Sequence, residues 1–317
     1  MSLIVTTSPG FGKHGRVPEE IERRGWDLVR CADAKEVCEH IGRADALVVG
    51  LVSVNAETLQ GAEQLKAVVK HGVGVDNIDI AACSEAGLPV CNTPGANADA
   101  VAELAIGMMF SMARFIPQGH ASVTSGGWDR QVGTQLGGKV LGIVGLGNIG
   151  KRLAILAKGL GMAVIATDKY PDKGFAKDHG IELLSFEDVL ARADYLSLHV
   201  FGGEGNSALI NPQTLEMMKP GAALINLARG EVVDLDAVAD ALESGQLGAA
   251  AIDAYVSEPP DISHPVFKHP RAIFTPHSGA DTIEAVENVG LMVIESLDAA
   301  LSGKRPPRCL NAAALNP

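Results

Sequence analysis

The chain has 317 residues, 47% of them hydrophobic and 20% charged, which is the profile of a globular protein with one large or two medium domains. Disordered, collagen-like and disulfide-stapled chains are therefore excluded. Its 26 Lys and Arg residues against 38 Asp and Glu give a formal net charge of -12, so no overall basic field attracts nucleic acid or anionic lipid. No run approaches the roughly 18 apolar residues of a membrane-spanning helix. We expect neither nucleic acid nor a membrane as a partner.

Five cysteines are scattered along the chain, and no two form a C-x-x-C pair. The first residues also lack the basic flank and apolar region of a secretory signal. Together these features predict reduced thiols, a cytoplasmic location, no disulfide framework and no metal site. The cysteines are Cys31, Cys38, Cys83, Cys91 and Cys309.

Short apolar runs alternate with helical patterns from the first residues onward. This rhythm is typical of βαβ units, in which helices join parallel strands. In the first third of the chain we expect strands at residues 3–6, 46–49, 67–70 and 89–91, with helices at 17–24 and 34–43. A second series predicts strands at 139–144, 163–167, 195–199, 223–226, 249–252 and 272–274. The pattern therefore predicts an α/β protein with two domains, each built on a parallel sheet.

Two longer helical patterns separate the two series. Residues 97–116 carry apolar side chains at helical spacing, and their methionines are expected in a buried core. Residues 280–301 form the second pattern, which ends at Gly303 and the following proline pair. If both helices connect the domains, the outer domain comprises residues 1–97 and 285–317, and the inner domain, residues 98–284, is an insertion.

The strand at 139–144 leads directly into Gly145-x-Gly147-x-x-Gly150 and then into a helical pattern. In this context the first glycine permits a tight turn, the second lets the backbone approach a pyrophosphate, and the third allows close helix-strand packing. Asp168 ends the next strand, where its carboxylate can accept hydrogen bonds from a ribose diol and would repel a 2′-phosphate. The motif therefore predicts NAD as the cofactor, while the adjacent Lys169 leaves the strictness of the preference over NADP open.

Three further segments, residues 224–234, 252–260 and 274–279, place reactive side chains after predicted strands. Open α/β sheets bind their ligands at these carboxyl ends. Hydride transfer between a hydroxy acid and a nicotinamide needs an arginine fork for the carboxylate, a histidine as acid and base, and a carboxylate that orients the histidine. The segments supply an arginine, acidic residues and a histidine, respectively.

Several different motifs, each typical of one protein family, are distributed along nearly the whole chain. They are His71-Gly-Val-Gly-Val-Asp-Asn-Ile-Asp79, Asn92-Thr-Pro-Gly-Ala-Asn97 leading to Val101-Ala-Glu-Leu104, the nucleotide fingerprint, Asn226-Leu-Ala-Arg-Gly230, Ser257-Glu-Pro259 and Pro276-His-Ser-Gly279. With this set the chain resembles the D-isomer-specific 2-hydroxyacid dehydrogenases, in the branch that contains D-3-phosphoglycerate dehydrogenase. The resemblance implies a flavodoxin-like substrate domain, a Rossmann domain that binds NAD, a homodimer built around the nucleotide domains, and closure of the two domains on the substrate.

Carried over residue by residue, the resemblance makes Arg229 the carboxylate-binding arginine, Glu258 the partner of the histidine, and His277 the acid and base. Asp253 resembles the residue that contacts the nicotinamide carboxamide. The cofactor residues that the resemblance implies are Gly145, Gly147, Asn148, Ile149, Gly150, Asp168, His199, Val200, Ala228, Asp253, His277 and Gly279. The implied substrate residues are His71, Val73, Gly74, Asn97 and Arg229, with backbone N–H groups of the 73–74 loop holding the carboxylate.

Some positions depart from the family pattern and leave the substrate open. His71 stands where relatives commonly have a small residue, and together with Lys70 it can supply positive charge to the distal end of the substrate. Leu51-Val52-Ser53 occupies a position where many relatives carry an arginine near a phosphate. Phe201-Gly202-Gly203-Glu204-Gly205 follows Val200 where the family usually continues with a proline, so we expect a differently shaped edge of the adenosine site.

We therefore predict an NAD-dependent D-2-hydroxyacid dehydrogenase that acts on a short 2-hydroxy or 2-oxo acid, with 3-phosphoglycerate as one candidate. A glyoxylate or hydroxypyruvate reductase is the alternative within the same chemistry. A non-catalytic NAD(H)-sensing protein of the same fold is the alternative from a different class, although no basic patch in the sequence favours it.

Overall fold

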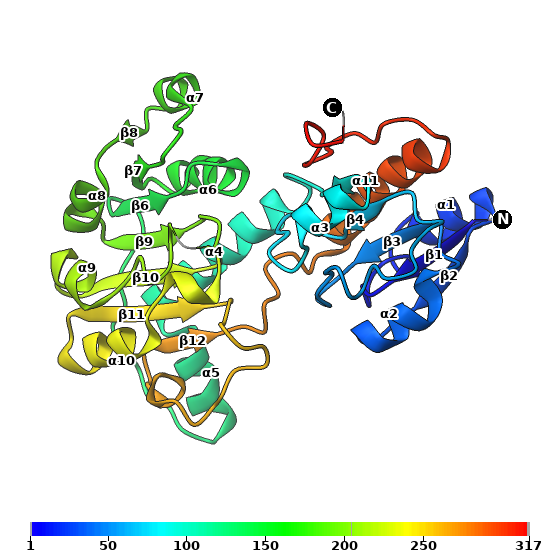
Figure 1. Ribbon diagram of the computed structural model, residues 1–317. Coiled ribbons are helices and arrows are strands. Elements are labelled where there is room, and N and C mark those ends of the chain that lie inside the picture. Colours follow the sequence, from blue (N-terminus) through cyan, green and yellow to red (C-terminus); the bar gives the residue numbers. More distant parts are fainter. Residues whose placement is uncertain (1, 204, 316–317) are drawn as a thin grey trace. The chain divides into compact units, whose positions relative to one another are not determined.

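The computed structural model describes residues 2–203 and 205–315. The chain folds into two compact units, Met1–Asn97 together with Asp281–Pro317 (unit 1) and Ala98–Ala280 (unit 2), whose elements Figure 1 colours along the sequence. The chain returns to unit 1 at Asp281, earlier than the residue 285 expected from the sequence. The reason is the helix that begins at Ile283, whose cap residue Thr282 accepts a hydrogen bond from the Ala285 N–H and so belongs to the same element.

Unit 1 is built on a five-stranded parallel sheet with the order β2-β1-β3-β4-β5. The strands expected from the sequence are present, with slightly different ends. β2 was not expected, because only the two central residues of this edge strand are apolar and its ends are exposed. The strands are β1 (Leu3–Thr6), β2 (Asp27–Arg30), β3 (Ala46–Val49), β4 (Val68–Lys70) and β5 (Val90–Cys91).

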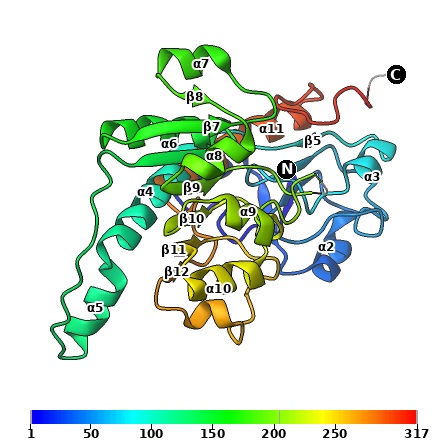
Figure 2. The same ribbon diagram turned by 90° about the vertical axis from the view of Figure 1, so that its left-hand side faces the viewer.

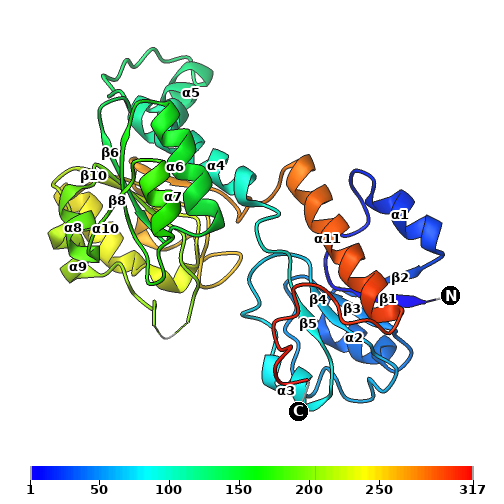
Figure 3. The same cartoon turned by 90° about the horizontal axis from the view of Figure 1, so that it is seen from above.

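Helices cover both faces of the unit 1 sheet (Figure 3). Capping fixes where two of them begin, since Asp33 accepts a hydrogen bond from the Glu36 N–H and Asp79 from the Ala82 N–H. One face packs against α1 and α11, and the other against α2 and α3. The helices are α1 (Val17–Arg24), α2 (Ala34–Ile41), α3 (Ile80–Glu85) and α11 (Ile283–Leu301).

Unit 2 is built on a seven-stranded parallel sheet with the order β12-β11-β10-β9-β6-β7-β8. The strand order reverses between β6 and β9, and such switch points open the crevice where doubly wound sheets bind ligands. The two-residue β8 was too short to be expected from the sequence. The strands are β6 (Val140–Val144), β7 (Ala163–Thr167), β8 (Glu182–Leu183), β9 (Tyr195–Leu198), β10 (Ala222–Asn226), β11 (Leu247–Ile252) and β12 (Ala272–Phe274).

Helices also cover both faces of the unit 2 sheet, with α4 and α6 on one side and α8, α9 and α10 on the other (Figure 3). The α-helices are α4 (Ala98–Arg114), α5 (Ile116–Thr124), α6 (Asn148–Gly159), α7 (Lys173–Asp178), α8 (Phe186–Arg192), α9 (Pro212–Met217) and α10 (Leu235–Ser244). Two short 3-10 helices complete the unit, η1 (Gly230–Val232) and η2 (Pro265–Lys268).

The helix expected at residues 97–116 is present as α4, which ends two residues earlier, at Arg114. Phe115 adopts the left-handed conformation (φ 54°), which ends α4 and redirects the chain into α5. No residue of α5 is buried, and Figure 2 shows this helix at the periphery of unit 2. Among the described residues no single helix is long and apolar enough to cross a membrane, although α4 and α5, bent by 63°, pass that test as a pair.

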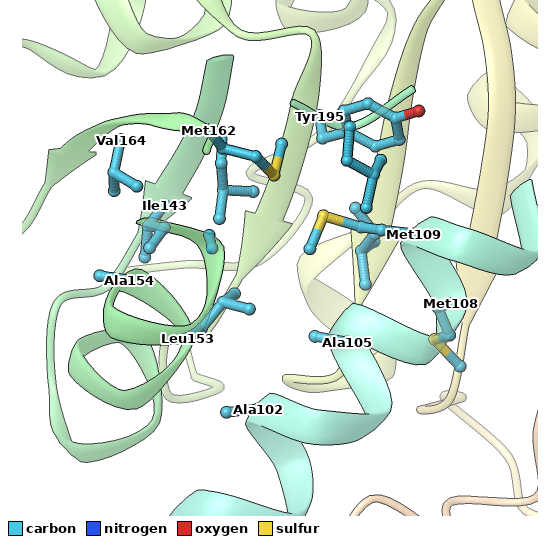
Figure 4. Close-up of a cluster of buried hydrophobic side chains, with 14 of the residues drawn as sticks. Ala102, Ala105, Met108, Met109, Ile143, Leu153, Ala154, Met162, Val164 and Tyr195 are labelled. Carbon is cyan, nitrogen blue, oxygen red and sulfur yellow. The ribbon is translucent and has the colours of Figure 1, made fainter. Parts of the chain in front are cut away.

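Small side chains let α4 pack closely against α6. Figure 4 shows Ala102 and Ala105 of α4 facing Leu153 of α6, with Met109 filling the space toward the sheet. The methionines of α4 lie in the core as expected, since Met108, Met109 and Met112 are all buried. This core supports β6 and therefore the turn that follows it.

Truncating Met109 should destabilise unit 2. The side chain is fully buried, so Met109→Ala leaves a cavity and should lower the free energy of unfolding by about 2–5 kcal/mol. Met217→Ala is the matched control, because Met217 is 48% exposed and its truncation should have little effect. Thermal and urea unfolding of both variants measure the difference, and equal losses would contradict this account of the core.

Candidate active site

The turn between β6 and α6 has the shape that the glycine fingerprint requires. Gly145 adopts φ 98°, and a Cβ atom there would lie 2.4 Å from the His199 carbonyl oxygen. A Cβ atom on Gly150 would lie 2.2 Å from the Gly145 carbonyl oxygen. A Cβ atom on Gly147, at the N-cap of α6, would meet nothing within 4 Å. The first and third glycines are thus needed by the chain itself, whereas the second leaves open space at a helix N-terminus that favours anions.

Asp168 is held beside this turn. Its carboxylate follows β7 and accepts hydrogen bonds from the Leu146 N–H and the Tyr170 N–H, each at 2.7 Å. Each oxygen keeps a lone pair for a ribose hydroxyl. The Lys169 ammonium lies 5.7 Å from the centre of the Tyr170 ring. The open helix N-terminus and the anchored carboxylate therefore fit the pyrophosphate and ribose of NAD.

His199 lies on the other side of the switch point, directly after β9. Its ring accepts or donates a hydrogen bond with the Ser197 hydroxyl at 2.8 Å. Burial lowers the pKa of His199 to about 4, so the ring is neutral at neutral pH. The next residue, Val200, approaches the turn, with its side chain 3.2 Å from a Cβ atom placed on Gly145. These two residues pack against the turn that begins the fingerprint.

Arg229 follows β10 in a loop that one buried amide shapes. The Asn226 side chain accepts a hydrogen bond from the Ala228 N–H at 3.0 Å and donates one to the Arg229 carbonyl at 2.9 Å. The Arg229 guanidinium donates to the Ala228 carbonyl at 2.8 Å. This loop-shaping role of Asn226 was not expected from the sequence, although a polar residue at the end of a buried strand, just before the Arg-Gly pair, could have indicated it.

Glu258 and His277 come together although they follow different strands. Nδ1 of His277 lies 2.7 Å from Oε1 of Glu258, and their side chains are 42% and 30% exposed. The Tyr255 N–H donates to the same carboxylate at 3.2 Å. Because a carboxylate only accepts hydrogen bonds, the contact places a proton on Nδ1 and leaves the Nε2 lone pair available.

Asp253 holds the loop that carries His277. Its buried carboxylate accepts hydrogen bonds from the Thr275 hydroxyl at 2.5 Å, the Ser278 N–H at 2.9 Å and the Gly279 N–H at 2.9 Å. The Tyr255 hydroxyl also donates to the Thr275 carbonyl, and burial raises its pKa to about 12. The sequence assigned Asp253 only to the carboxamide of the cofactor, and its structural role went unnoticed.

The three proposed catalytic side chains follow neighbouring strands of one sheet. β10, β11 and β12 are adjacent and parallel, as Figure 1 shows, so their carboxyl ends meet at one edge. Arg229, Glu258 and His277 come from the loops at that edge. The arrangement offers a cation for a carboxylate and a hydrogen-bonded acid-base pair within unit 2.

The implied substrate residues other than Arg229 lie in unit 1. The Asn92 side chain donates to the Val73 carbonyl at 2.7 Å, and the Thr93 N–H donates to the Gly72 carbonyl at 3.0 Å. These bonds hold the loop that contains Val73 and Gly74. Asn97 ends the unit before α4, and its Oδ1 is buried without a hydrogen-bond partner among the described residues.

His71 differs from the expectation in its charge. Its Nδ1 lies 3.1 Å from the Ser8 hydroxyl, and its ring packs edge-on against Phe11. Burial, together with the nearby Lys70 ammonium, lowers the pKa of His71 to about 4. The ring is therefore neutral at neutral pH and supplies no positive charge. The Lys70 ammonium donates to the Gly50 carbonyl at 2.6 Å and to Asn77 at 2.7 Å.

Comparison with known proteins identifies the family. Residues 106–279 match the D-isomer specific 2-hydroxyacid dehydrogenase family, NAD binding domain. The chain belongs to this family, and unit 2 is its NAD-binding Rossmann domain. The strand order of unit 1 is that of flavodoxin-like sheets, as expected.

Three relatives illustrate the similarity. D-3-phosphoglycerate dehydrogenase 3, chloroplastic, of Arabidopsis thaliana is 38% identical over 309 residues, which cover 93% of this chain and 53% of that protein. A crystal structure from Thermus thermophilus is 31% identical with a TM-score of 0.89, covering 98% of this chain and 100% of that one. A glyoxylate reductase from Paecilomyes thermophila is 26% identical with a TM-score of 0.87, covering 98% of each chain. The chain thus spans about half the length of the curated relative.

Alanine substitutions at two glycines should separate cofactor binding from folding. Gly147→Ala should leave the fold unchanged, because a Cβ atom there meets nothing, but should weaken NADH binding about tenfold or more by keeping a phosphate away from the backbone. Gly150→Ala should lower the melting temperature, because its Cβ atom collides with the Gly145 carbonyl. NADH titration by fluorescence and thermal unfolding measure the two effects, and the reverse pattern would contradict the assignment.

Proposed function

We propose that this protein is an NAD-dependent D-2-hydroxyacid dehydrogenase, which transfers a hydride between NAD(H) and a short 2-hydroxy or 2-oxo acid. The observation that carries the proposal is the 2.7 Å contact between His277 and Glu258, at the same sheet edge as Arg229. An acid-base pair beside a carboxylate-binding cation is what this reaction needs. The family assignment, which concerns the same unit, supports it.

Each residue has its own role in the proposed reaction. Arg229 binds the substrate carboxylate with its planar fork, and the N–H groups of Val73 and Gly74 are further carboxylate donors. Nε2 of His277 takes the proton of the substrate hydroxyl as the C2 hydride leaves, and it returns the proton in reduction. The Glu258 carboxylate fixes the tautomer of His277 and stabilises the imidazolium that forms. NAD, when bound, supplies the hydride acceptor.

The cofactor is held by the groups at the switch point of unit 2. The N-terminus of α6, at Gly147, Asn148 and Ile149, binds the pyrophosphate, and Asp168 binds the adenosine ribose. A carboxylate at this position opposes a 2′-phosphate, so we propose NAD rather than NADP. The remaining cofactor residues of the proposal are Gly145, Gly150, His199, Val200, Ala228, Asp253, His277 and Gly279.

A 2-hydroxy acid of two or three carbon atoms is the proposed substrate class. The curated relative named above is a D-3-phosphoglycerate dehydrogenase, which supports 3-phosphoglycerate, and the similar structure from Paecilomyes thermophila is a glyoxylate reductase. The neutral ring of His71 and the absence of arginine from residues 51–53 favour an uncharged distal group such as a hydroxyl. A glyoxylate or hydroxypyruvate reductase therefore remains the second candidate.

Activity measurements on substituted protein test this function. The wild-type protein should oxidise NADH with one of phosphohydroxypyruvate, hydroxypyruvate or glyoxylate. His277→Ala should lower kcat by about 10²–10⁴-fold, because the proton has no acceptor, while NADH binding persists. Arg229→Lys should chiefly raise KM through loss of the bidentate contact. His179→Ala, an exposed histidine on unit 2, is the matched control and should keep full activity.

Two outcomes would contradict the assignment. Full turnover by His277→Ala would remove the acid-base role. Tight NADH binding without turnover of any 2-oxo acid would instead indicate the NAD(H)-sensing protein of the same fold.

We also propose a homodimer in which a second copy covers an apolar surface on α4, α5 and α6. Exposed apolar patches of this kind mark interfaces. A hollow in this surface is lined by Glu103, Ile106, Gly107, Leu156 and Leu160. The exposed apolar side chains of these helices are Phe110, Ile116, Val123, Ile155 and Leu156, and Leu160 follows directly after α6. The family resemblance supports an interface on the nucleotide domains.

A charge placed on this surface should separate the copies. Val123 is 58% exposed on α5, which has no buried residue, so Val123→Glu should leave the fold intact and weaken the dimer at least about tenfold by burying a carboxylate. Leu51→Glu, at a 76% exposed position on unit 1, is the control and should stay dimeric. Sedimentation velocity measures both, and a monomeric wild-type protein would overturn the dimer.

A cytoplasmic location completes the proposal. The five cysteines carry free thiols, which is typical of reducing compartments. The net charge of -12 gives no support for nucleic acid or anionic membranes as partners.

A further inference from the structure

The segment after α11 pairs with the edge of the unit 1 sheet. Residues 306–315, called the C-terminal strap here, run beside β5, which is the last strand of the order β2-β1-β3-β4-β5. Cys309 of the strap lies opposite Cys91 of β5 in an antiparallel bridge, and the Leu310 N–H donates to the Val90 carbonyl at 2.8 Å. Two cysteines that are far apart in the sequence therefore become direct cross-strand neighbours.

Hydrogen bonds on both sides of Cys309 fix this register. The buried side chain of Asn311 accepts from the Val90 N–H and donates to the Ser84 hydroxyl and the Leu88 carbonyl, each at 2.9 Å. On the other side, Arg308 adopts φ 58° and donates to Glu295 at 2.7 Å. A shift of the strap by one residue would break these bonds, so the pairing of the two cysteines is specific.

The backbone bridge places the two cysteines directly opposite each other. The Cys309 thiol is near enough to contribute to the raised pKa of Cys91, and Cys309 Sγ donates to the Asn311 side-chain oxygen at 3.4 Å. Directly opposed residues of an antiparallel pair have Cα atoms about 4.5–5.5 Å apart. Disulfides span Cα distances of about 4.4–6.8 Å. The backbone therefore needs little movement to accommodate a bond between the two sulfur atoms.

We propose that Cys91 and Cys309 form a redox-active thiol pair, which small-molecule disulfides such as oxidised glutathione convert to an intramolecular disulfide. This modification site is independent of the proposed dehydrogenase activity. In a reducing compartment the pair is a reversible dithiol, and reversible pairs are the usual form of cytosolic disulfide.

The exchange proceeds in two balanced steps. The partly exposed Cys309 attacks the small disulfide as its thiolate, forming a mixed disulfide and releasing one small thiol. The Cys91 thiolate then attacks the Cys309 sulfur, which forms the protein disulfide and releases the second small thiol. The two protein thiols lose two electrons and two protons in total, and the small disulfide gains them as two thiols. Burial raises the pKa of Cys91 to about 12, so the second step is slow and accelerates as the pH rises.

The disulfide would link the C-terminal strap to the residues that hold the proposed substrate loop. Asn92 and Thr93 follow Cys91 directly and hold the carbonyl groups of Val73 and Gly72. A covalent link at Cys91 therefore ties these residues to the segment after α11. It also closes a long loop in the unfolded chain, so the oxidised protein should melt at a higher temperature than the reduced protein.

Oxidation of the folded full-length protein tests the proposal. After incubation with oxidised glutathione, Cys91 and Cys309 should both lose their free thiols without carrying a glutathione adduct, whereas the exposed Cys38 carries one, and dithiothreitol should restore all five thiols. Digestion with trypsin and a glutamate-specific protease cuts after Glu85 and Arg308, which separates Cys83 from Cys91 and releases Cys309. Mass spectrometry should then identify the Cys91–Cys309 peptide pair, and its rate of appearance should increase with pH.

Two cysteine variants distinguish the Cys91–Cys309 disulfide from oxidation at other thiols. Cys309→Ser should abolish the cross-link and the rise in melting temperature, and because Cys309 lies on the strap it should leave the sheet folded. Cys38→Ser removes an exposed thiol on α2 and should leave cross-linking unchanged. The proposal is overturned if Cys309 ends only as a mixed disulfide with glutathione, or if Cys91 keeps a free thiol in oxidised protein. Both readouts are independent of enzymatic turnover, so an inactive protein tests the pair equally well.

Discussion

The buried carboxylate of Asp253 connects the two loops that carry the acid-base pair. Asp253 directly follows β11. Its carboxylate accepts hydrogen bonds from Thr275, Ser278 and Gly279, which surround His277 in the loop after β12. His277 itself adopts φ 51°, a conformation that non-glycine residues keep only where neighbouring groups enforce it. The 2.7 Å contact between His277 and Glu258 therefore depends on the loop architecture as much as on the two side chains.

The same principle recurs along the unit 2 sheet, where short polar bonds at strand ends shape each loop. Asn226 fixes the backbone on both sides of Ala228, so the chain enters Arg229 in a defined direction. At the switch point, the Gly145 turn packs so closely against the His199 carbonyl that no side chain fits between them. Parallel strands deliver all these loops to one edge, and buried hydrogen bonds then set the position of each functional group.

Local patterns in the sequence were sufficient for most of the fold. Apolar runs and helical periodicity predicted the long strands, and the spacing from Gly145 to Asp168 predicted the nucleotide turn, because these features depend on neighbouring residues. The turn at Phe115 and the second helix that follows it were not expected, since nothing in an apolar helical pattern indicates a left-handed residue. The role of Asp253 in holding a loop was missed for a different reason. The three groups that donate hydrogen bonds to its carboxylate lie in the loop after β12, far from Asp253 in the sequence. The pairing of Cys91 with Cys309 depends on tertiary contacts between distant segments, so cysteine spacing alone indicated isolated thiols.

Burial also changes the charge that a sequence suggests. Lys70 and His71 are two basic residues at the end of β4, and in water both contribute to binding an anion. In the folded unit, desolvation and the adjacent ammonium remove the charge from His71, because two neighbouring cations out of water would repel each other. The imidazole then acts as a neutral hydrogen-bonding group toward Ser8, and the Lys70 ammonium donates to the Gly50 carbonyl and to Asn77. For the substrate loop of the proposed function, we therefore expect selectivity to depend more on hydrogen-bond geometry and shape than on the number of basic residues in the motif.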